Sequence, residues 1–185
     1  IATRQRCLSR ILNWEFHRHA LRAGSWLDCG GMLLHPSGMR QQHSYHRLFF
    51  HLVFSTKNRE RLIKSLADGE TIAGFFEVKA HDLDAYVEEF GCWRDHVHVL
   101  VRTPPRLALA TLYGQMKGFA THAWLECYPN HPFRWQDGAY SITVDPDHCQ
   151  ELRHYIRNQW RRHESGTSVA EWEPPDQGPQ DLPEE

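Results

Sequence analysis

The sequence contains no Cys-x-x-Cys pair, and its five cysteines are odd in number and widely spaced. This pattern argues against both a disulfide framework and a zinc ribbon, so we expect a reduced, cytoplasmic protein. No apolar run approaches the length of a membrane-spanning helix, and no secretory signal is visible, so we expect no membrane association. With 185 residues, the chain has room for one domain of ordinary size.

Positive charge is absent from the C-terminal end of the chain. Residues 163–185 contain seven acidic residues and no Lys or Arg. The first 162 residues therefore hold all 21 basic residues and 16 of the 23 acidic ones, a net charge of +5. A mildly basic body is compatible with nucleic-acid binding. The Pro- and Glu-rich stretch 167–185 is expected to be a disordered acidic tail.

The first 40 residues lack a sustained hydrophobic period, and several glycines interrupt them. Met39 stands just ahead of the first convincing element. We therefore expect translation to start near Met39, with residues 1–40 an extension that is disordered or not part of the natural product. The alternative is a packed N-terminal helical hairpin. The domain itself is assigned to residues 41–166.

Strands and helices alternate through this domain. Strands are expected at 47–55, 84–93, 95–101, 133–136 and 139–144, and helices at 60–82, 106–127 and 146–162. The first helix is expected to be interrupted near Asp68-Gly69, and the last to begin at an Asp145-Pro146 cap. The order β-α-β-β-α-β-β-α predicts an α+β fold with an antiparallel sheet and helices mainly on one face.

The most informative stretch is Asp95-His96-Val97-His98-Val99-Leu100-Val101. In a strand, alternate residues share a face, so His96 and His98 lie on one face and the valines on the other. Two neutral imidazoles side by side form half of a divalent-metal site. The alternative is a strand whose polar face happens to be histidine, in a chain with 14 histidines.

Tyr155 and Gln159 lie four residues apart on the last expected helix and share one face, away from the apolar stripe through Leu152 and Ile156. A tyrosine near a divalent metal can attack a phosphodiester, because the metal polarises the phosphate. The carbonyl oxygen of Gln159 can serve as a third ligand, which completes a set suited to Mg²⁺ or Mn²⁺. The alternative for Tyr155 is an interfacial aromatic with its hydroxyl in water.

Five motifs follow one another in the order of a known family. They are Ser55-Thr56-Lys57-Asn58-Arg59, Asp95-His96-Val97-His98, Gln115-Met116-Lys117-Gly118, Trp135-Gln136-Asp137-Gly138-Ala139-Tyr140-Ser141 and Tyr155-Ile156-Arg157-Asn158-Gln159. Across residues 45–163 the chain resembles the single-tyrosine HUH transposases of small bacterial insertion sequences, including the repeat-associated tyrosine transposases. The N-terminal 40 residues and the acidic tail have no place in that pattern.

This resemblance implies a ferredoxin-like (RRM-like) sheet and a metal-dependent DNA transposase. Such an enzyme cleaves and rejoins single-stranded DNA near hairpin ends through a 5′-phosphotyrosine intermediate and a free 3′-OH. Carried over to this sequence, His96 and His98 bind the metal, Gln159 is the third ligand and Tyr155 is the nucleophile. The resemblance also implies a homodimer, and in many such enzymes the tyrosine helix of one subunit serves the histidines of the other.

Five basic residues are expected to contact DNA: Lys57, Arg59, Lys117, Arg134 and Arg157. Two other activities compete with the transposase. A histidine-triad nucleotide hydrolase is disfavoured, because Leu100 occupies the position of its third histidine. A non-catalytic protein of the same fold that binds single-stranded DNA or RNA hairpins remains open. Tyr140 is a competing nucleophile on an expected strand.

Overall fold

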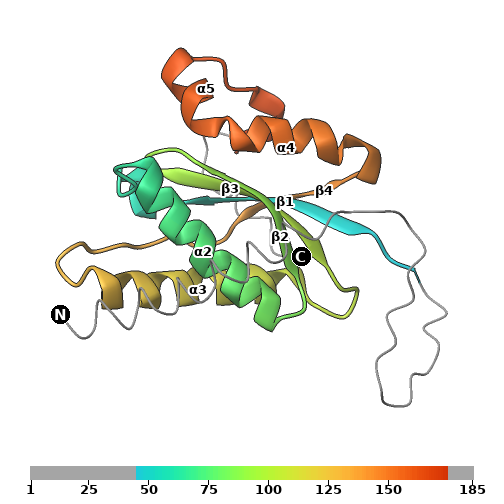
Figure 1. Ribbon diagram of the computed structural model, residues 1–185, viewed down its shortest axis with the longest axis horizontal. Coiled ribbons are helices and arrows are strands. Elements are labelled where there is room, and N and C mark those ends of the chain that lie inside the picture. The colour runs from blue at the N-terminus through green and yellow to red at the C-terminus, as the bar shows by residue number, and fades with distance from the viewer. Residues whose placement is uncertain (1–44, 175–185) are drawn as a thin grey trace, which may run out of the picture. The chain divides into compact units, whose positions relative to one another are not determined.

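The structure is a computed structural model that describes residues 45–174, and the predictions for residues 1–40 lie outside this part of the chain. Figure 1 shows the described elements in space. The strands are β1 (Leu48–Ser55), β2 (Tyr86–Cys92), β3 (His96–Thr103) and β4 (Tyr140–Val144). The helices are α2 (Leu66–Asp82), α3 (Leu109–Cys127), α4 (Cys149–Arg157) and α5 (Gln159–Ser165). Short 3-10 turns lie at η1 (Lys57–Arg59), η2 (Pro146–His148) and η3 (Ala170–Trp172).

The four strands form one antiparallel sheet in the order β2-β3-β1-β4. Strand β3, which carries both histidines, is therefore an inner strand with a hydrogen-bonded neighbour on each side. Its register pairs His98 with Val53 of β1 and with Gly91 of β2. This central position fixes the histidine backbone on both sides.

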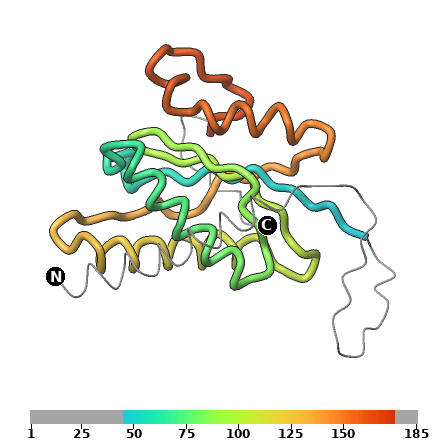
Figure 2. Tube along the Cα trace, viewed as in Figure 1, coloured from blue at the N-terminus to red at the C-terminus, as the bar shows by residue number. Residues whose placement is uncertain are grey.

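The two long helices cover one face of the sheet, and the shorter α4 and α5 lie on the other (Figure 1). The trace in Figure 2 follows the chain from β4 across to α4. On the α2 and α3 side, Phe54 packs edge-on against Phe76 of α2, with ring centroids 5.5 Å apart. On the opposite side, Phe49 and Leu100 form a buried cluster with residues of α4. The predicted α+β fold with an antiparallel sheet is confirmed.

Helix α2 begins at a capping box rather than at residue 60. The Ser65 hydroxyl accepts from the Asp68 backbone N–H, and the Asp68 carboxylate accepts from the Ser65 backbone N–H. This reciprocal cap satisfies two orphan donors of the first turn. The interruption expected near Asp68-Gly69 is therefore wrong, because Asp68 starts the helix instead of breaking it.

Two other expected elements also differ from the structure. The expected strand at 133–136 is a single bridge between Thr56 and Trp135. The helix expected to run to residue 162 is divided at Asn158, which follows α4 and precedes α5. The Asn158 side chain donates to the carbonyl of His154, a local bond that competes with continued helix.

The expectation of a disordered tail from residue 167 does not hold for residues 167–174. Residues 167–174 are described and include η3, whose Trp172 packs against α4; residues 175–185 lie outside the described chain. Among the described cysteines, Cys92 and Cys149 are buried free thiols, but Cys127 is disulfide-bonded, so the expectation of a fully reduced chain is wrong at that residue. Within residues 45–174, no helix is both long enough and apolar enough to cross a membrane.

Candidate active site

His96 and His98 point to the same side of β3, towards α4 and α5, and both are fully buried. Their rings lie edge to face with centroids 5.1 Å apart. Val97, Val99 and Val101 are also buried, on the opposite face of the strand. The side-chain alternation predicted from the sequence therefore holds along this strand.

Each histidine has a partner behind it that sets its orientation. His96 Nδ1 lies 2.6 Å from Asp95 Oδ1, so the ring donates there and leaves Nε2 with its lone pair. His98 Nδ1 lies 2.9 Å from Nε2 of His51, a buried histidine on β1. This second contact was missed by sequence reasoning, although His51 is a lone polar residue in the apolar run RLFFHLVFS.

Burial and neighbouring carboxylates shift the pKa values of these histidines in opposite directions. Burial lowers the pKa of His98 to about 4 and the pKa of His51 to about 3, so both rings are neutral near pH 7. Burial also opposes a charge on His96, but the carboxylates of Asp95 and Glu173 outweigh it and raise the pKa of that ring. Neutral imidazoles are the forms that bind metals.

The break at Asn158 brings two side chains of α5 to the histidine pair. Gln159 is fully buried, and its Nε2 lies 2.5 Å from His98 Nε2. Its Oε1 is buried and has no hydrogen-bond partner. One turn later, His163 lies against His96 with ring centroids 4.8 Å apart. Sequence reasoning did not single out His163, although it stands four residues after Gln159, the spacing that joined Tyr155 to Gln159.

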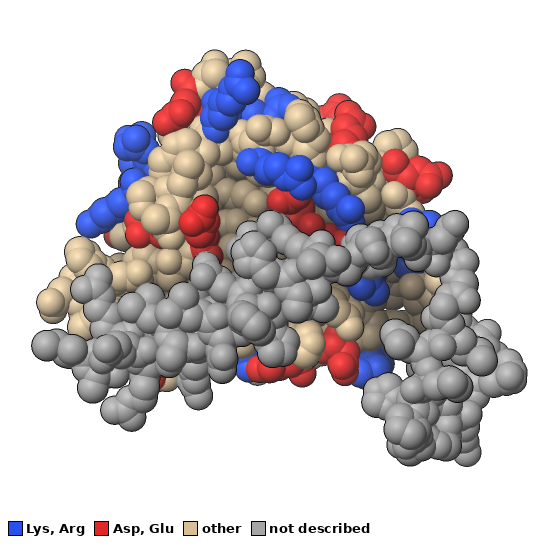
Figure 3. Space-filling model, viewed as in Figure 1, with Lys and Arg blue, Asp and Glu red and all other residues tan. Residues whose placement is uncertain are grey.

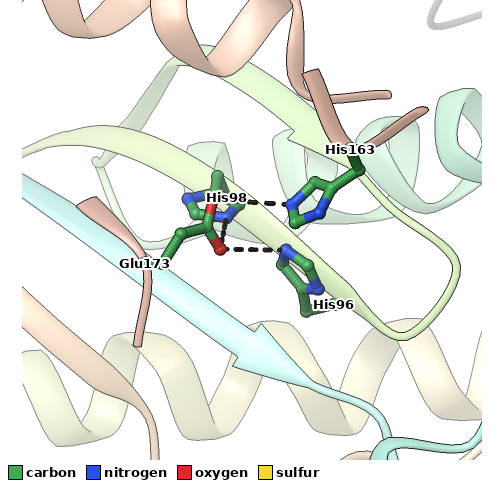
Figure 4. A group of neighbouring side chains, drawn as sticks. All are labelled: His96, His98, His163 and Glu173. Carbon is green, nitrogen blue, oxygen red and sulfur yellow. Dashed lines mark ion pairs between the residues drawn. The ribbon is translucent and has the colours of Figure 1, made fainter. Parts of the chain in front are cut away.

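Glu173, from the segment after α5, reaches into the centre of this group (Figure 4). Its Oε2 lies 3.3 Å from Nε2 of both His96 and His98, and its Oε1 lies 3.5 Å from Nε2 of His163. Burial would raise the pKa of Glu173, but the three imidazoles around it hold that pKa far below the ordinary value. The carboxylate is therefore ionised at neutral pH.

Tyr155 lies next to this group and is fully buried in the cluster on α4. Its hydroxyl donates to Glu173 Oε1 at 2.5 Å and accepts from the Val169 backbone N–H at 3.1 Å. Trp172 covers its ring, with centroids 4.6 Å apart. Burial, with the bond to Glu173, raises the pKa of Tyr155 to about 12. The hydroxyl lies beside the histidine group and is enclosed by Glu173 and Val169. The expectation that Tyr155 faces away from the apolar stripe is wrong, because Tyr155 packs in one buried cluster with Leu152 and Ile156.

The side chains fit a divalent cation. The ligand atoms of His96, His98, His163 and Glu173 all lie within 4.8 Å of one another. Nε2 of His96 and Nε2 of His163 are buried without a hydrogen-bond partner, as lone pairs reserved for a metal would be. Imidazole ligands favour transition metals, whereas an all-oxygen set would favour Mg²⁺, so this group suits Mn²⁺ better than Mg²⁺.

The basic residues predicted to meet DNA are engaged in different ways. Lys57 pairs with Asp137 at 3.3 Å, and Arg59 pairs with Asp95 at 3.3 Å. Arg59 therefore contacts the same carboxylate that orients His96. On the visible described surface in Figure 3, Lys and Arg lie beside Asp and Glu instead of forming a continuous field of one sign.

The other three lie farther along the chain. Arg157 on α4 is exposed and pairs with Glu89 of β2 at 2.6 Å. Lys117 donates to the carbonyl oxygens of Gln136 and Gly138 at 2.5 and 2.6 Å, so it braces a loop. Arg134 is exposed in that same loop.

Sequence comparison decides the family. Residues 44–159 match the profile of the protein family described as "Transposase IS200 like". The chain belongs to the IS200-like transposase family.

Two curated IS200 transposases resemble the chain over most of their length. The transposases of insertion sequence IS200 from Salmonella typhimurium and Salmonella typhi are each 25% identical to it over 130 residues, which is 65% of this chain and 82% of theirs. A crystal structure assigned to a transposase of Deinococcus radiodurans superposes with a TM-score of 0.53 at 17% identity. It covers 66% of this chain and 98% of that one, and shares the fold. The REP-associated tyrosine transposase bound to a REP hairpin gives a TM-score of 0.49 at 13% identity, over 71% of this chain and 76% of that one.

Only some residues of the candidate site of this IS200-like transposase lie within the family match. His96, His98, Tyr155 and Gln159 all lie within the matched residues 44–159. His163 and Glu173 lie beyond them. The candidate metal group therefore combines residues of the matched region with side chains from the C-terminal segment that follows it.

Proposed function

We propose that this IS200-like transposase cleaves and rejoins single-stranded DNA near hairpin ends through a covalent 5′-phosphotyrosine intermediate. Tyr155 is the nucleophile, and His96 and His98 bind a divalent cation with Gln159 as a third ligand. The observation that carries the proposal is the carboxylate of Glu173, which touches the Tyr155 hydroxyl with one oxygen and approaches both histidines with the other. One small anion thus spans the nucleophile and the histidine pair, as a scissile phosphate must.

The residues have distinct roles in the proposed reaction. The Tyr155 oxygen forms a bond to phosphorus, the bond from phosphorus to the 3′ oxygen breaks, and the phenol proton is balanced by the proton gained by the leaving 3′-OH. A bound divalent ion would polarise the phosphate and stabilise its developing charge. Asp95 and His51 contact Nδ1 of the two imidazoles, so that Nε2 of each ring is directed towards Glu173. Arg162 lies over the Tyr155 ring at 4.9 Å, where its charge favours a developing phenolate.

The DNA partner follows from the transposase family, and the basic residues Lys57, Arg59 and Arg157 are proposed to contact its phosphates. Each is partly or fully exposed and already sits beside a carboxylate, so DNA would replace an existing ion pair. Arg134 is proposed as a further phosphate contact, and Lys117 as a brace for its loop. Homodimer formation and a cytoplasmic location stay predictions.

One observation favours the alternative of a non-catalytic protein that binds single-stranded DNA or RNA hairpins. The Tyr155 hydroxyl is enclosed by Glu173, Val169 and Trp172, so it cannot meet a phosphodiester while this segment keeps its position. A nucleophile that never becomes exposed would leave binding as the only activity.

The two functions are separated by an adduct assay with single-stranded hairpin DNA and Mn²⁺. The wild-type chain should form a protein–DNA adduct that survives denaturation. Tyr155→Phe removes only the hydroxyl and should abolish the adduct while hairpin binding stays nearly intact. Tyr140→Phe, the matched control, should keep it. If Tyr155→Phe still forms adducts and Tyr140→Phe does not, the nucleophile is Tyr140. If the wild type binds hairpin DNA but never forms an adduct, the non-catalytic binding function is favoured.

A further inference from the structure

Two side chains outside the family match lie where the coordination sphere of the proposed ion would be completed. They are His163 of α5 and Glu173 of the following segment. We propose that His163 and Glu173 are ligands of the same ion as His96 and His98, so that the C-terminal segment closes the metal centre. This inference rests on the proposed function and deepens it for the DNA-free chain, in which Glu173 lies between Tyr155 and the histidine pair.

The distances within this group match those between neighbouring ligands of one ion. Metal–nitrogen and metal–oxygen bonds are about 2.0–2.2 Å long, which places adjacent ligand atoms roughly 3.0–3.5 Å apart. Glu173 Oε2 lies 3.3 Å from Nε2 of His96 and of His98, and Glu173 Oε1 lies 3.5 Å from Nε2 of His163. Despite this closeness, Nε2 of His96 and Nε2 of His163 have no hydrogen-bond partner.

His163 is held in place independently of these contacts. Its ring stacks on Trp93, with centroids 5.3 Å apart and an angle of 14° between the planes. Trp93 also packs against Trp160 at 5.0 Å, which ties α5 to the end of β2. A stacked ring with a buried, unpartnered nitrogen is oriented as a ligand, as His96 is by Asp95.

Glu173 is held in position by hydrogen bonds from two side chains of the same site. Gln159 Nε2 donates to its Oε1 at 2.6 Å, and the Tyr155 hydroxyl donates to the same atom. Oε2 receives neither bond and faces the two histidines of β3. The carboxylate therefore offers one oxygen to the protein and one to the ion, and its negative charge offsets part of the charge of a divalent cation.

Metal binding to the full chain tests the proposal. Mn²⁺ titration calorimetry should show one site in the wild type, and His96→Ala should abolish it. Glu173→Gln and His163→Phe should each weaken Mn²⁺ binding by at least about tenfold, the smallest loss ordinarily seen even for residues behind a ligand. Matched controls are Glu171→Gln on the same segment and His154→Phe on α4, both exposed, which should leave affinity unchanged.

Pulsed electron paramagnetic resonance of bound Mn²⁺ gives a readout that a merely structural role would not move. It should count three coordinated imidazole nitrogens in the wild type and two in His163→Phe. A count of two imidazole nitrogens in both proteins, or an unchanged Mn²⁺ affinity in Glu173→Gln, would overturn the proposal. Either result would still allow a metal site that depends on His96. If the wild type binds no Mn²⁺, the metal dependence in the proposed function is wrong.

Discussion

At the scale of single residues, the centre of this protein depends on imidazoles that are buried without charge. His51 and His98 are stacked with centroids 5.1 Å apart and joined through a ring nitrogen of each. A proton on either ring would place a positive charge in a site from which water is excluded. The same neutrality that prepares His98 for a metal therefore makes the metal-free protein sensitive to acid.

This sensitivity predicts how stability depends on pH in EDTA. The pKa values of His51 and His98 are lowered to about 3 and about 4, so both stay neutral in the folded state while the unfolded chain takes up protons below about 6.5. Their contribution is present above pH 6.5 and is lost as pH falls towards 4. Each should cost about 2 kcal/mol between pH 6.5 and 5, and His96, whose pKa is raised, works in the opposite direction.

Urea denaturation at several pH values measures the effect. Stability should fall on acidification below pH 6.5, and His51→Leu should flatten that slope even if it lowers stability at pH 8. The exposed His154→Leu is the matched control and should keep the wild-type slope. A wild-type stability that is constant from pH 7 to 5 would contradict the prediction.

At the scale of elements, the site requires α4 to pass close to the sheet, and Gly91 provides the room. A Cβ at Gly91 would come 1.8 Å from the carbonyl oxygen of Ile156, and 3.1 Å from Cβ of Gln159. Backbone cannot yield as a flexible side chain does, so a side chain at this position would push α4 away from β2. This close contact sets the distance between β2 and α4, the helix that carries Tyr155.

Gly91→Ala should therefore destabilise the fold by about 2–4 kcal/mol and slow adduct formation, because α4 is displaced. Gly114→Ala makes the same chemical change inside α3, where an added Cβ meets nothing within 4 Å. That control should gain up to about 1 kcal/mol from helix propensity. Denaturant unfolding checks both proteins, and a Gly91→Ala variant as stable as the wild type would refute the close contact.

The elements were largely predictable from local pattern. The apolar run that became β1 and the alternation in Asp95-His96-Val97-His98 place the histidine strand correctly, because side-chain period is a local property. The break at Asn158 was not predictable from that pattern, since its neighbours favour helix. Within residues 133–136 the pairing is limited to one bridge, between Trp135 and Thr56, the residue that follows β1.

The site was predictable only in part for the same reason. His96, His98 and Tyr155 belong to motifs with recognisable spacing, and the structure brings them together. Glu173 stands in an acidic, Pro-rich stretch whose composition indicates a solvated tail, so no local signal assigns it to a buried site. The enclosure of Tyr155 depends on that same segment, and was missed with it.

At the scale of the whole molecule, the proposed nucleophile and the proposed metal-binding histidines lie side by side within the described chain. The rings of Tyr155 and His98 have centroids 6.0 Å apart, and the Glu173 carboxylate touches the Tyr155 hydroxyl and approaches both histidines. Ion pairs between α4 and β2, such as Arg153 with Glu88 at 2.5 Å, hold the tyrosine helix on its own sheet. This arrangement predicts that Tyr155 acts with the histidines of its own chain.

A mixing experiment tests this arrangement. Tyr155→Phe lacks the nucleophile and keeps the histidines, whereas His96→Ala keeps the nucleophile and lacks a metal ligand. If each site is built within one chain, the two variants co-expressed with different tags and purified together should form no DNA adduct, because no chain holds both groups. Wild type co-expressed with either variant is the control and should retain adducts on wild-type chains alone. Adducts on the His96→Ala chain of the double-variant mixture would instead show that Tyr155 of one subunit serves the histidines of the other. That result would require α4 to leave the sheet on which it lies here, and the ion pair between Arg153 and Glu88 to break.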